Sequence, residues 1–413
     1  MLKSKIQNLK SKILIVGAGP SGASLAIRLV REKFRVCLIE RERFPRPKLC
    51  GEFISPECFE HFRELKVLDA MLSAGGERIA ETIFFAPGGK SINVASSWFN
   101  GDAQGALSLS RAEMDLQLLE RAKRVGVEVL EEHSAVELLE ENNKIRGLKV
   151  RTKDGKAKEI FADLFVDATG RARILGNLIS RKTAKAQSFK IQNPKSKIQN
   201  RLVGFKAHLK EVNMEKGACE IYFFPDGYGG LSFVENGRAN FCFLIKADAV
   251  KRFSSDAQQI VRQLIFQNKR ACETLKNAEP VDDWLAVSVD DFGQKDLNPA
   301  ANLFAVGDAG AFIDPFTGSG MLMAMESAEI LARAIAANSL TEKIAKQYRT
   351  EHARRFQRRL FICSLMRRAA FVPALSKILI SALSIGDFPR KMLARATRPA
   401  VSVSKIYQSR QNL

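Results

Sequence analysis

Residues 13–22 read ILIVGAGPSG, and this stretch decides the fold of the chain. An apolar run typical of a buried strand ends at Gly17, and Pro20 suits the first turn of a helix. Gly17, Gly19 and Gly22 follow the G-x-G-x-x-G spacing. In that spacing the first glycine permits a tight turn, the second lets the backbone approach a pyrophosphate, and the third lets the helix pack on the strand. The stretch therefore predicts a βαβ opening whose helix N-terminus faces phosphates.

A carboxylate follows at the distance that this fingerprint requires. The second apolar run, RVCLIE, ends in Glu40. An acid at this point accepts hydrogen bonds from a ribose 2′-hydroxyl and would repel a 2′-phosphate. The glycines and Glu40 together predict a dinucleotide site, and the structural alternative is a tight turn beside a surface acid.

Two later motifs favour a flavin dinucleotide. LFVDATGR (164–171) and LFAVGDAGAFIDPFTGSGM (303–321) supply an Asp after a strand, a glycine-rich loop and a helix start. The N-terminus of that helix can stabilise negative charge on a reduced flavin, and Asp308 can hydrogen-bond ribityl hydroxyls. The structural alternative is an ordinary strand–helix junction, which does not explain all the pieces together.

Together with FPRPKLCGE (44–52) and SRAEMD (110–115), these motifs resemble the FAD-dependent oxidoreductases of the p-hydroxybenzoate-hydroxylase type, and most of all their geranylgeranyl reductase branch. The resemblance covers roughly residues 13–340. It implies that the glycine turn and Glu40 bind the ADP half of FAD, that Arg111 contacts the cofactor, and that Asp308 holds the ribityl chain. The cofactor-binding residues that it implies are Gly17, Gly19, Pro20, Ser21, Gly22, Glu40, Arg41, Cys50, Gly51, Arg111, Val136, Gly307, Asp308, Pro315, Gly318, Ser319, Gly320 and Met321.

The same resemblance gives Cys50 a position. The family's Pro-x-x-x-Cys-Gly pattern is met only in part, since Pro47 precedes Cys50 by three residues. The resemblance implies that Cys50 lines the reaction cavity beside the flavin, with Lys48 and Glu52 close by. A small cavity-wall thiol without a chemical role is the alternative.

The family's Tyr-x-Trp-x-Phe-Pro signature is altered in this chain. Aligned on Phe224 and Pro225, it has Glu220 at the tyrosine position and Tyr222 at the tryptophan position. The aromatic strand can still wall an apolar cavity. The predicted catalytic residues are Cys50, Glu52 and Tyr222, and the candidates for a general acid by residue type are Glu52, Tyr222, His208 and Lys48.

The pattern along the chain predicts an α/β fold in which a Rossmann-like FAD-binding domain is interleaved with an antiparallel sheet. The FAD-binding domain comprises residues 13–75, 105–182 and 290–340, and the substrate domain, with phenylalanine-rich strands, comprises 76–104 and 201–289. Repeats of KSKIQN-like segments mark a disordered leader (1–12) and a low-complexity insertion (183–200). A basic helical region follows (341–413).

Composition narrows the function. The chain has 413 residues, 46% of them apolar, and a formal net charge of +20, but no helix-turn-helix, zinc-finger or RNP signature accompanies that charge, so no nucleic-acid partner is expected. The seven cysteines are scattered, without metal-ligand spacing, so no metal is expected. With no cleavage site and no apolar run long enough to span a bilayer, the sequence predicts a cytoplasmic protein.

The C-terminal region predicts a membrane contact. Residues 354–398 contain eleven Lys and Arg against one acid, Asp387, interspersed with short apolar stretches. Such a segment is typical of a peripheral anchor on anionic lipid, and a solvated helical cap is the alternative.

The leading hypothesis is an FAD-dependent reductase of carbon–carbon double bonds in an apolar, isoprenoid-like small molecule or lipid. NAD(P)H or a small electron carrier would be the transient donor, because the sequence has no second dinucleotide fingerprint. The alternative is a monooxygenase that activates oxygen at flavin C4a. The halogenase version lacks its Gly-Trp-x-Trp-x-Ile-Pro segment. A non-catalytic lipid carrier is a third hypothesis, and the intact cofactor motifs argue against it.

Overall fold

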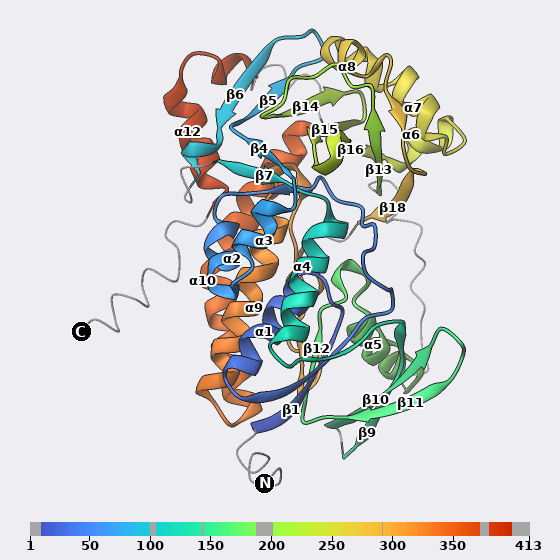
Figure 1. Cartoon of the computed structure of the whole chain (residues 1–413), viewed down its shortest axis with the longest axis vertical. Coiled ribbons are helices and arrows are strands. Elements are labelled where there is room, and N and C mark those ends of the chain that lie inside the picture. Colours follow the sequence, from blue (N-terminus) through green and yellow to red (C-terminus); the bar gives the residue numbers. More distant parts are fainter. Residues whose placement is uncertain are drawn as a thin grey trace, which may run out of the picture.

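The computed structural model describes residues 10–99, 105–142, 144–186, 201–290, 292–371 and 380–398, and Figure 1 shows their arrangement. The predicted leader through residue 9 and residues 187–200 of the predicted insertion lie outside the described residues. Residues 10–12, which the sequence pattern places in the leader, instead begin the first strand, because they pair with the strand beside it. Residues 183–186 close helix α5 (Ile174–Ala186).

Five parallel strands form the first sheet. Their order is β20 (Leu303–Ala305), β12 (Leu164–Asp167), β1 (Lys10–Val16), β2 (Phe34–Ile39) and β8 (Glu128–Leu130). These strands are short apolar runs because both faces of the sheet are covered. Ile13 and Ile15 join the core formed with helices α1 (Pro20–Arg31), α4 (Arg111–Arg124) and α9 (Gly320–Ala337). Leu14 and Val16 join the core under the three-stranded sheet of β9 (His133–Glu141), β10 (Lys144–Thr152) and β11 (Ala157–Phe161).

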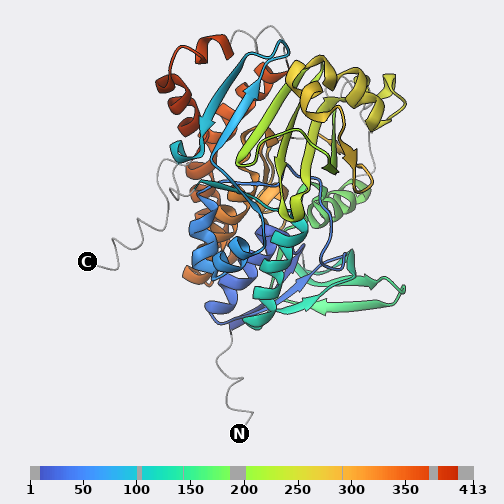
Figure 2. The same cartoon turned by 45° about the horizontal axis from the view of Figure 1, so that its top comes forward.

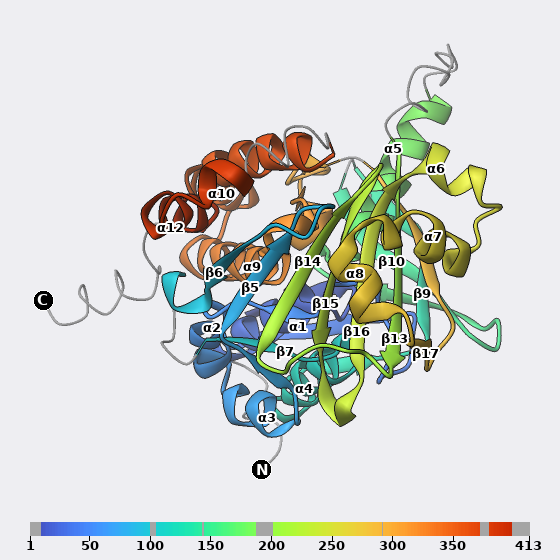
Figure 3. The same ribbon diagram turned by 90° about the horizontal axis from the view of Figure 1, so that it is seen from above.

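The second sheet has eight strands and lies above the first layer in Figure 1. Its order is β17 (Glu279–Pro280), β13 (Leu202–Lys210), β16 (Ala239–Lys246), β15 (Gly227–Phe233), β14 (Ala218–Phe224), β5 (Glu81–Phe85) and β6 (Ser91–Ala95), with β18 (Leu285–Val289) also on β13. All pairs are antiparallel except β14 with β5, which is parallel. Helices α6 (Ala247–Arg252), α7 (Ala257–Gln263) and α8 (Lys269–Leu275) cover the outer face (Figures 2 and 3).

Short elements join the two layers. Strands β3 (Phe53–Ile54), β4 (Glu77–Ile79) and β7 (Ala106–Ser108) form a small sheet, and α2 (Cys58–Leu65) and α3 (Leu68–Ser73) follow β3 in the chain. The predicted cap of α4 is confirmed, since Ser110 Oγ accepts a hydrogen bond from the Glu113 amide at 3.2 Å. After α9, α10 (Thr341–Ala370) and α12 (Asp387–Ala396) lie along one flank (Figure 3).

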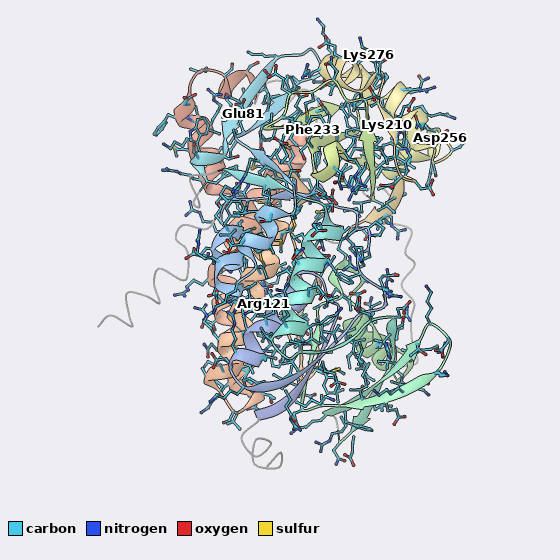
Figure 4. The ribbon with its side chains drawn as sticks, viewed as in Figure 1. Glu81, Arg121, Lys210, Phe233, Asp256 and Lys276 are labelled. Carbon is cyan, nitrogen blue, oxygen red and sulfur yellow. The ribbon has the colours of Figure 1, made fainter. Side chains whose placement is uncertain are left out.

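The predicted fold class is confirmed: a Rossmann-like parallel sheet, a largely antiparallel sheet and C-terminal helices. Figure 4 shows the side chains of both layers, with Arg121 on α4 in the first and Lys210 and Phe233 in the second. Among the helices of the described ranges, none combines the length and the apolar character needed to cross a bilayer.

Candidate functional site

A cavity of about 1080 Å³ runs from the glycine turn of the first sheet to the inner face of the second sheet. Its floor is formed by the carboxyl ends of β1 and β2, where open α/β sheets bind their ligands. Its roof is formed by β14, β15 and β18. One continuous cavity therefore joins the predicted cofactor site to the second sheet.

The glycine turn has the shape that a pyrophosphate needs. Gly17 has φ +102°, and a Cβ on Gly22 would lie 1.8 Å from the Gly17 carbonyl oxygen, so both positions require glycine. A Cβ on Gly19 would meet nothing closer than 3.7 Å, which leaves open space above the start of α1. No side chain caps α1, and its first turn has no acid, so its N-terminal amides remain available to phosphate oxygens.

Glu40 closes the turn at the end of β2. Its carboxylate is buried and accepts hydrogen bonds from the amides of Ala18 at 2.9 Å, Arg41 at 3.0 Å and Glu42 at 3.1 Å. These bonds fix the acid beside Gly17 on the cavity wall, where a ribose would lie. The glycine turn and Glu40, which the first helix separates in the sequence, are thus adjacent in space.

Cationic side chains face the same part of the cavity. Arg46, Lys48, Arg111 and Arg171 line it. Asp115 accepts two hydrogen bonds of 2.8 Å from Arg111, one from Nε and one from Nη2. Burial alone would lower the pKa of Arg111, but Asp115 outweighs it and raises that pKa. The positive charge suits a diphosphate.

Asp308 lines the cavity from the 3-10 turn η7 (Gly307–Ala309), whose Gly307 packs closely on Ser21 at the start of α1. Its carboxylate has no hydrogen bond with another part of the described chain, and it is partly accessible from the cavity, so it is free to accept ribityl hydroxyls. Burial raises the pKa of Asp308, while Arg171, Arg111 and Lys48 act in the opposite direction. These residues together fit FAD. The glycine turn would bind the phosphates, Glu40 the ribose, the cationic side chains the diphosphate charge, and Asp308 the ribityl hydroxyls.

The loop after η7 supplies the third side of the cofactor site. Pro315, Gly318, Gly320 and Met321 line the cavity. Gly318 has φ +60°, and α9 begins two residues later at Gly320, with no side-chain cap on its first amides. This helix end is the one expected to face the flavin.

Most of the predicted site residues line this cavity, and five do not. Those that line it are Gly17, Gly19, Pro20, Ser21, Glu40, Arg41, Cys50, Gly51, Glu52, Arg111, Asp308, Pro315, Gly318, Gly320 and Met321. Of the others, Gly22 packs on Gly17, Gly307 contacts Ser21, and Ser319 is fully buried with its hydroxyl 2.8 Å from that of Thr317. On β9 the wall is made by residues 133–135, and Val136 lies beyond it.

Tyr222, the fifth, is a correction. Its side chain is fully buried in the core between β14 and helices α6–α8, and its hydroxyl donates to Glu220 at 2.6 Å. Successive residues of a strand point to opposite faces, so Phe223 lines the cavity and Tyr222 cannot. Glu220, at the other altered signature position, is held by Arg270 in the same core.

The loop that contains Cys50 is held against the second sheet by hydrogen bonds. Cys50 lines the cavity, and its carbonyl accepts a hydrogen bond from Asn240 at 3.2 Å. Two residues on, the buried Glu52 carboxylate accepts from the Arg111 amide at 2.8 Å and from Lys206 Nζ, and it lies 2.9 Å from His208 Nε2. His208 Nδ1 in turn lies 3.2 Å from the exposed Asp282 carboxylate.

Glu52 is therefore an anion at neutral pH. Burial alone would raise its pKa, but the hydrogen bonds and charges of His208 and Lys206 outweigh burial and lower the pKa of Glu52. Sequence reasoning missed Lys206. The signal was present, since Lys206 and His208 are polar residues two apart on one face of a strand that is otherwise apolar up to Leu209.

The other half of the cavity is apolar. Phe84, Ile92, Val94, Phe223 and Leu244 come from the second sheet. The C-terminal helices, which the sequence pattern treats as a separate region, supply Met366, Ile380, Leu383 and Leu393.

Near the apolar half, Tyr228 donates a hydrogen bond of 2.8 Å to the buried Asp314. Arg367 of α10 lies 3.3 Å from the same carboxylate. The loop that faces the flavin site is thus tied both to the second sheet and to α10.

The cysteines and the potential metal ligands of the described residues do not indicate a metal site. All seven cysteines are free thiols. In the described part of the chain one group, His61, Glu64 and Glu329, has ligand atoms close enough to hold a metal ion. Arg28 occupies that group, pairing with Glu64 and lying 3.1 Å from His61 Nδ1.

Known proteins share both the sequence pattern and the fold. The FAD binding domain family model matches residues 10–360. A flavin-dependent halogenase of Armillaria mellea is 24% identical over 383 residues, which cover 86% of this chain and 73% of the halogenase. A digeranylgeranylglycerophospholipid reductase of Methanosarcina mazei is 26% identical over 333 residues, which cover 79% of this chain and 75% of the reductase.

Solved structures agree on the fold. A triple mutant of a flavin-dependent brominase superposes with a TM-score of 0.76 at 18% identity, covering 98% of this chain and 99% of the brominase. A geranylgeranyl bacteriochlorophyll reductase-like protein of Thermoplasma acidophilum gives 0.68 at 19% identity, covering 97% of this chain and 96% of that protein. The chain belongs to the FAD binding domain family, and it is an FAD-dependent oxidoreductase related to the geranylgeranyl reductases.

Proposed function

We propose that the protein reduces carbon–carbon double bonds of an apolar, isoprenoid-like substrate. The observation that carries this proposal is the composition of the cavity beyond the cofactor residues. Its walls there are aromatic and aliphatic side chains from the second sheet and the C-terminal helices, with Phe223 and Leu244 on one side and Leu383 and Leu393 on the other. A long apolar chain would lie in it without leaving polar groups unpaired.

FAD, once bound and reduced, supplies the hydride for such a reduction. The chain's own residues exclude water and set the position of the substrate. Phe84, Phe223 and Phe316 pack against one another with ring centroids 5.8 to 6.5 Å apart, which closes the apolar wall next to the flavin loop. A dry wall protects the hydride from solvent.

Saturating a double bond also needs a proton, and Lys48 is the proposed donor. Its side chain is accessible from the cavity, and it lies two residues before Cys50. Desolvation inside the cavity, together with Arg111 and Arg46, lowers the pKa of Lys48 to about 8. An ammonium group with such a pKa gives up its proton more readily than an ordinary lysine. Glu52, being ionised, serves instead to hold the Cys50 loop in place.

The donor of electrons to FAD is part of the same proposal. NAD(P)H or a small electron carrier would reach the flavin transiently, because the chain has one G-x-G-x-x-G turn and the cavity already contains it. The names of the relatives support an isoprenoid substrate, since digeranylgeranylglycerophospholipid reductases recur among them and squalene epoxidases match 38% of the chain.

The second candidate is a flavin-dependent monooxygenase. It is favoured by the halogenase and brominase among the similar proteins, and by the squalene epoxidases. Both candidates need the same cofactor site and the same apolar cavity, so they differ only in what the reduced enzyme reacts with.

The test mixes anaerobically reduced holoenzyme with geranylgeraniol, a defined polyprenyl alkene. The reductase proposal expects the oxidised flavin spectrum to return and a product two hydrogens heavier. Lys48→Met should slow this step by roughly 10² to 10⁴-fold per bound flavin. The rate is taken per bound flavin because Lys48 also belongs to the cations of the cofactor site. If flavin reoxidises only with air and the product gains oxygen, the monooxygenase replaces the reductase.

A further inference from the structure

The outer faces of the two C-terminal helices expose large apolar side chains. Phe361 and Leu365 on α10 are 64% and 49% exposed, and Phe388 and Met392 on α12 are 75% and 59% exposed. Ile385, just before α12, is 86% exposed. Single exposed apolar residues are ordinary, but five of the nine large ones found in the described chain lie within these 32 residues of sequence, 361–392.

Exposed arginines flank these side chains on the same helical stripes. Arg354, Arg358, Phe361, Leu365 and Arg368 follow one another at intervals of four and three residues, so they share one face of α10. Arg395 follows Phe388 and Met392 on one face of α12 in the same way. We call these eight residues and Ile385 the α10–α12 face.

The arginines of this face have no acidic partner in the part of the chain that the structure describes. No ion pair joins Arg354, Arg358, Arg368 or Arg395 to an acid in the described ranges, and residues 352–370 contain no acid at all. Asp387, the one acid of the C-terminal segment, pairs with Arg390. The face therefore combines protruding apolar groups with uncompensated positive charge.

The arginines on the inner face of α10 are different, because they pair with acids of the core. Arg355 and Arg359 bind the buried Glu326 of α9, and Arg367 pairs with Asp314. These arginines hold α10 on the core. Met366 of α10 and Leu393 of α12 line the apolar half of the cavity, as do Ile380 and Leu383, which lie between the two helices in sequence.

We propose that the α10–α12 face docks on an anionic lipid bilayer, and that the substrate enters the cavity from the bilayer between these helices. The inference rests on the proposed function for its substrate, and it adds where that substrate comes from. Figures 1 and 3 show α10 and α12 on the same flank of the molecule, and the residues opposite the exposed stripes already line the cavity. Apolar side chains that enter the headgroup region, with arginines at the level of the phosphates, are the features of interfacial helices.

The experiment is co-sedimentation of the flavin-loaded full chain with vesicles of phosphatidylcholine alone or mixed with phosphatidylglycerol. Three double variants are compared: Arg354→Glu with Arg358→Glu, Phe388→Ser with Met392→Ser, and Lys153→Glu with Lys156→Glu. The third is the matched control. It makes the same change in charge on two side chains that are 85% and 84% exposed at the β10–β11 turn, far from α12 in Figure 1.

We expect the unmodified protein to bind the mixed vesicles more tightly than those of phosphatidylcholine alone. The arginine pair should weaken binding by about thirtyfold, the apolar pair by roughly tenfold, and the control pair little. Unchanged flavin absorbance in each variant shows that it has folded.

Three results would overturn the proposal. An equal loss with the control pair would mean that the net charge of +20 binds any polyanion. Retained binding in the apolar pair, with loss only in the arginine pair, would mean that charge alone holds the protein at the headgroups and that the apolar side chains do not enter the bilayer. A dimer in solution that dissociates with the apolar pair would make the face a subunit contact. Because sedimentation requires no turnover, a protein that binds vesicles but reduces no alkene would refute the reductase alone.

Discussion

Three glycines near the cofactor site differ in what an added methyl group would contact. A Cβ at Gly22 would lie 1.8 Å from a backbone oxygen, and one at Gly51 would have nothing within 4 Å. A Cβ at Gly19 would be in ordinary contact with the Arg111 side chain at 3.7 Å and clash with nothing. We expect Gly22→Ala to prevent folding, because neither α1 nor β1 can move away. Gly19→Ala should fold with a normal melting temperature but bind FAD more weakly, since its methyl group fills the space above the helix N-terminus. Gly51→Ala, where the added Cβ meets nothing, should fold normally and lose less FAD than Gly19→Ala.

Flavin content and thermal melting of the three purified variants check this series. If Gly19→Ala loses stability without FAD, the space above the helix serves the protein rather than the cofactor.

Glu52 is the residue whose role changed most between sequence and structure. By type it was a candidate acid, but its buried carboxylate neutralises Lys206 and fixes the loop of Cys50. Glu52→Gln leaves a lysine ammonium 3% exposed without its anion, so we expect a loss of about 3 to 5 kcal/mol in unfolding free energy. The loosened loop should also make Cys50 react faster with a maleimide.

Urea unfolding and thiol labelling measure the two effects. Glu52→Gln combined with Lys206→Met should recover much of the stability, because the orphaned charge is gone. A double variant as unstable as the single one would show that the ion pair is not the cause.

At the scale of one element, β14 divides its side chains between two functions. Tyr222 faces the core under α6–α8, and Phe223 faces the cavity. Tyr222→Phe removes the donor to Glu220 in that core and should cost about 1 to 3 kcal/mol of stability without altering the cavity. Phe223→Leu should change stability less but weaken the binding of an apolar dye to the holoenzyme. Urea unfolding and dye titration check the pair, and a Tyr222→Phe variant with altered dye binding would contradict the assignment.

Helix α10 shows what a sequence pattern leaves out. Its run of arginines predicts a basic helix, and the helix is there. The pattern cannot tell which arginines are structural, because Glu326 and Asp314, their partners, precede α10 in the chain and become neighbours only through packing. Once one arginine is known to face the core, helical spacing identifies the next, since Arg355 and Arg359 are four residues apart and share one face.

At the scale of the whole molecule, the cofactor half was predictable and the substrate half was not. Gly17, Gly19, Glu40 and Asp308 belong to local motifs whose spacing reflects one strand–turn–helix geometry, so the sequence alone indicates their site. The apolar half draws its wall from β5, β14, β15 and the C-terminal helices, segments brought together only by the complete fold. Tyr222 was misplaced for a related reason: a strand with core on one side and cavity on the other is apolar on both, so periodicity does not distinguish its faces.

The whole molecule should also be sensitive to acid through two buried histidines. His61 lies on α2 and His352 on α10, and burial, aided by Arg28 and Arg359 respectively, lowers the pKa of each to about 4. Their unfolded pKa is about 6.5, so between pH 6.5 and pH 4 the unfolded chain binds more protons than the folded one. Stability is therefore lost as the pH falls through this window.

Replacing one histidine measures how much that residue contributes to the loss of stability at low pH. Both ring nitrogens of His352 lack a hydrogen-bond partner among the described residues, and its ring packs against Tyr348 and Phe356. His352→Leu should therefore be tolerated at pH 7 and should be more stable than the parent by about 2 kcal/mol at pH 5. Burial raises the pKa values of Asp308, Asp314 and Glu329, and these carboxyls oppose the trend, so the difference between the two proteins is the informative quantity. Urea unfolding midpoints at pH 7 and pH 5 measure this difference. An equal fall in midpoint for parent and variant would show that His352 does not titrate as its burial requires.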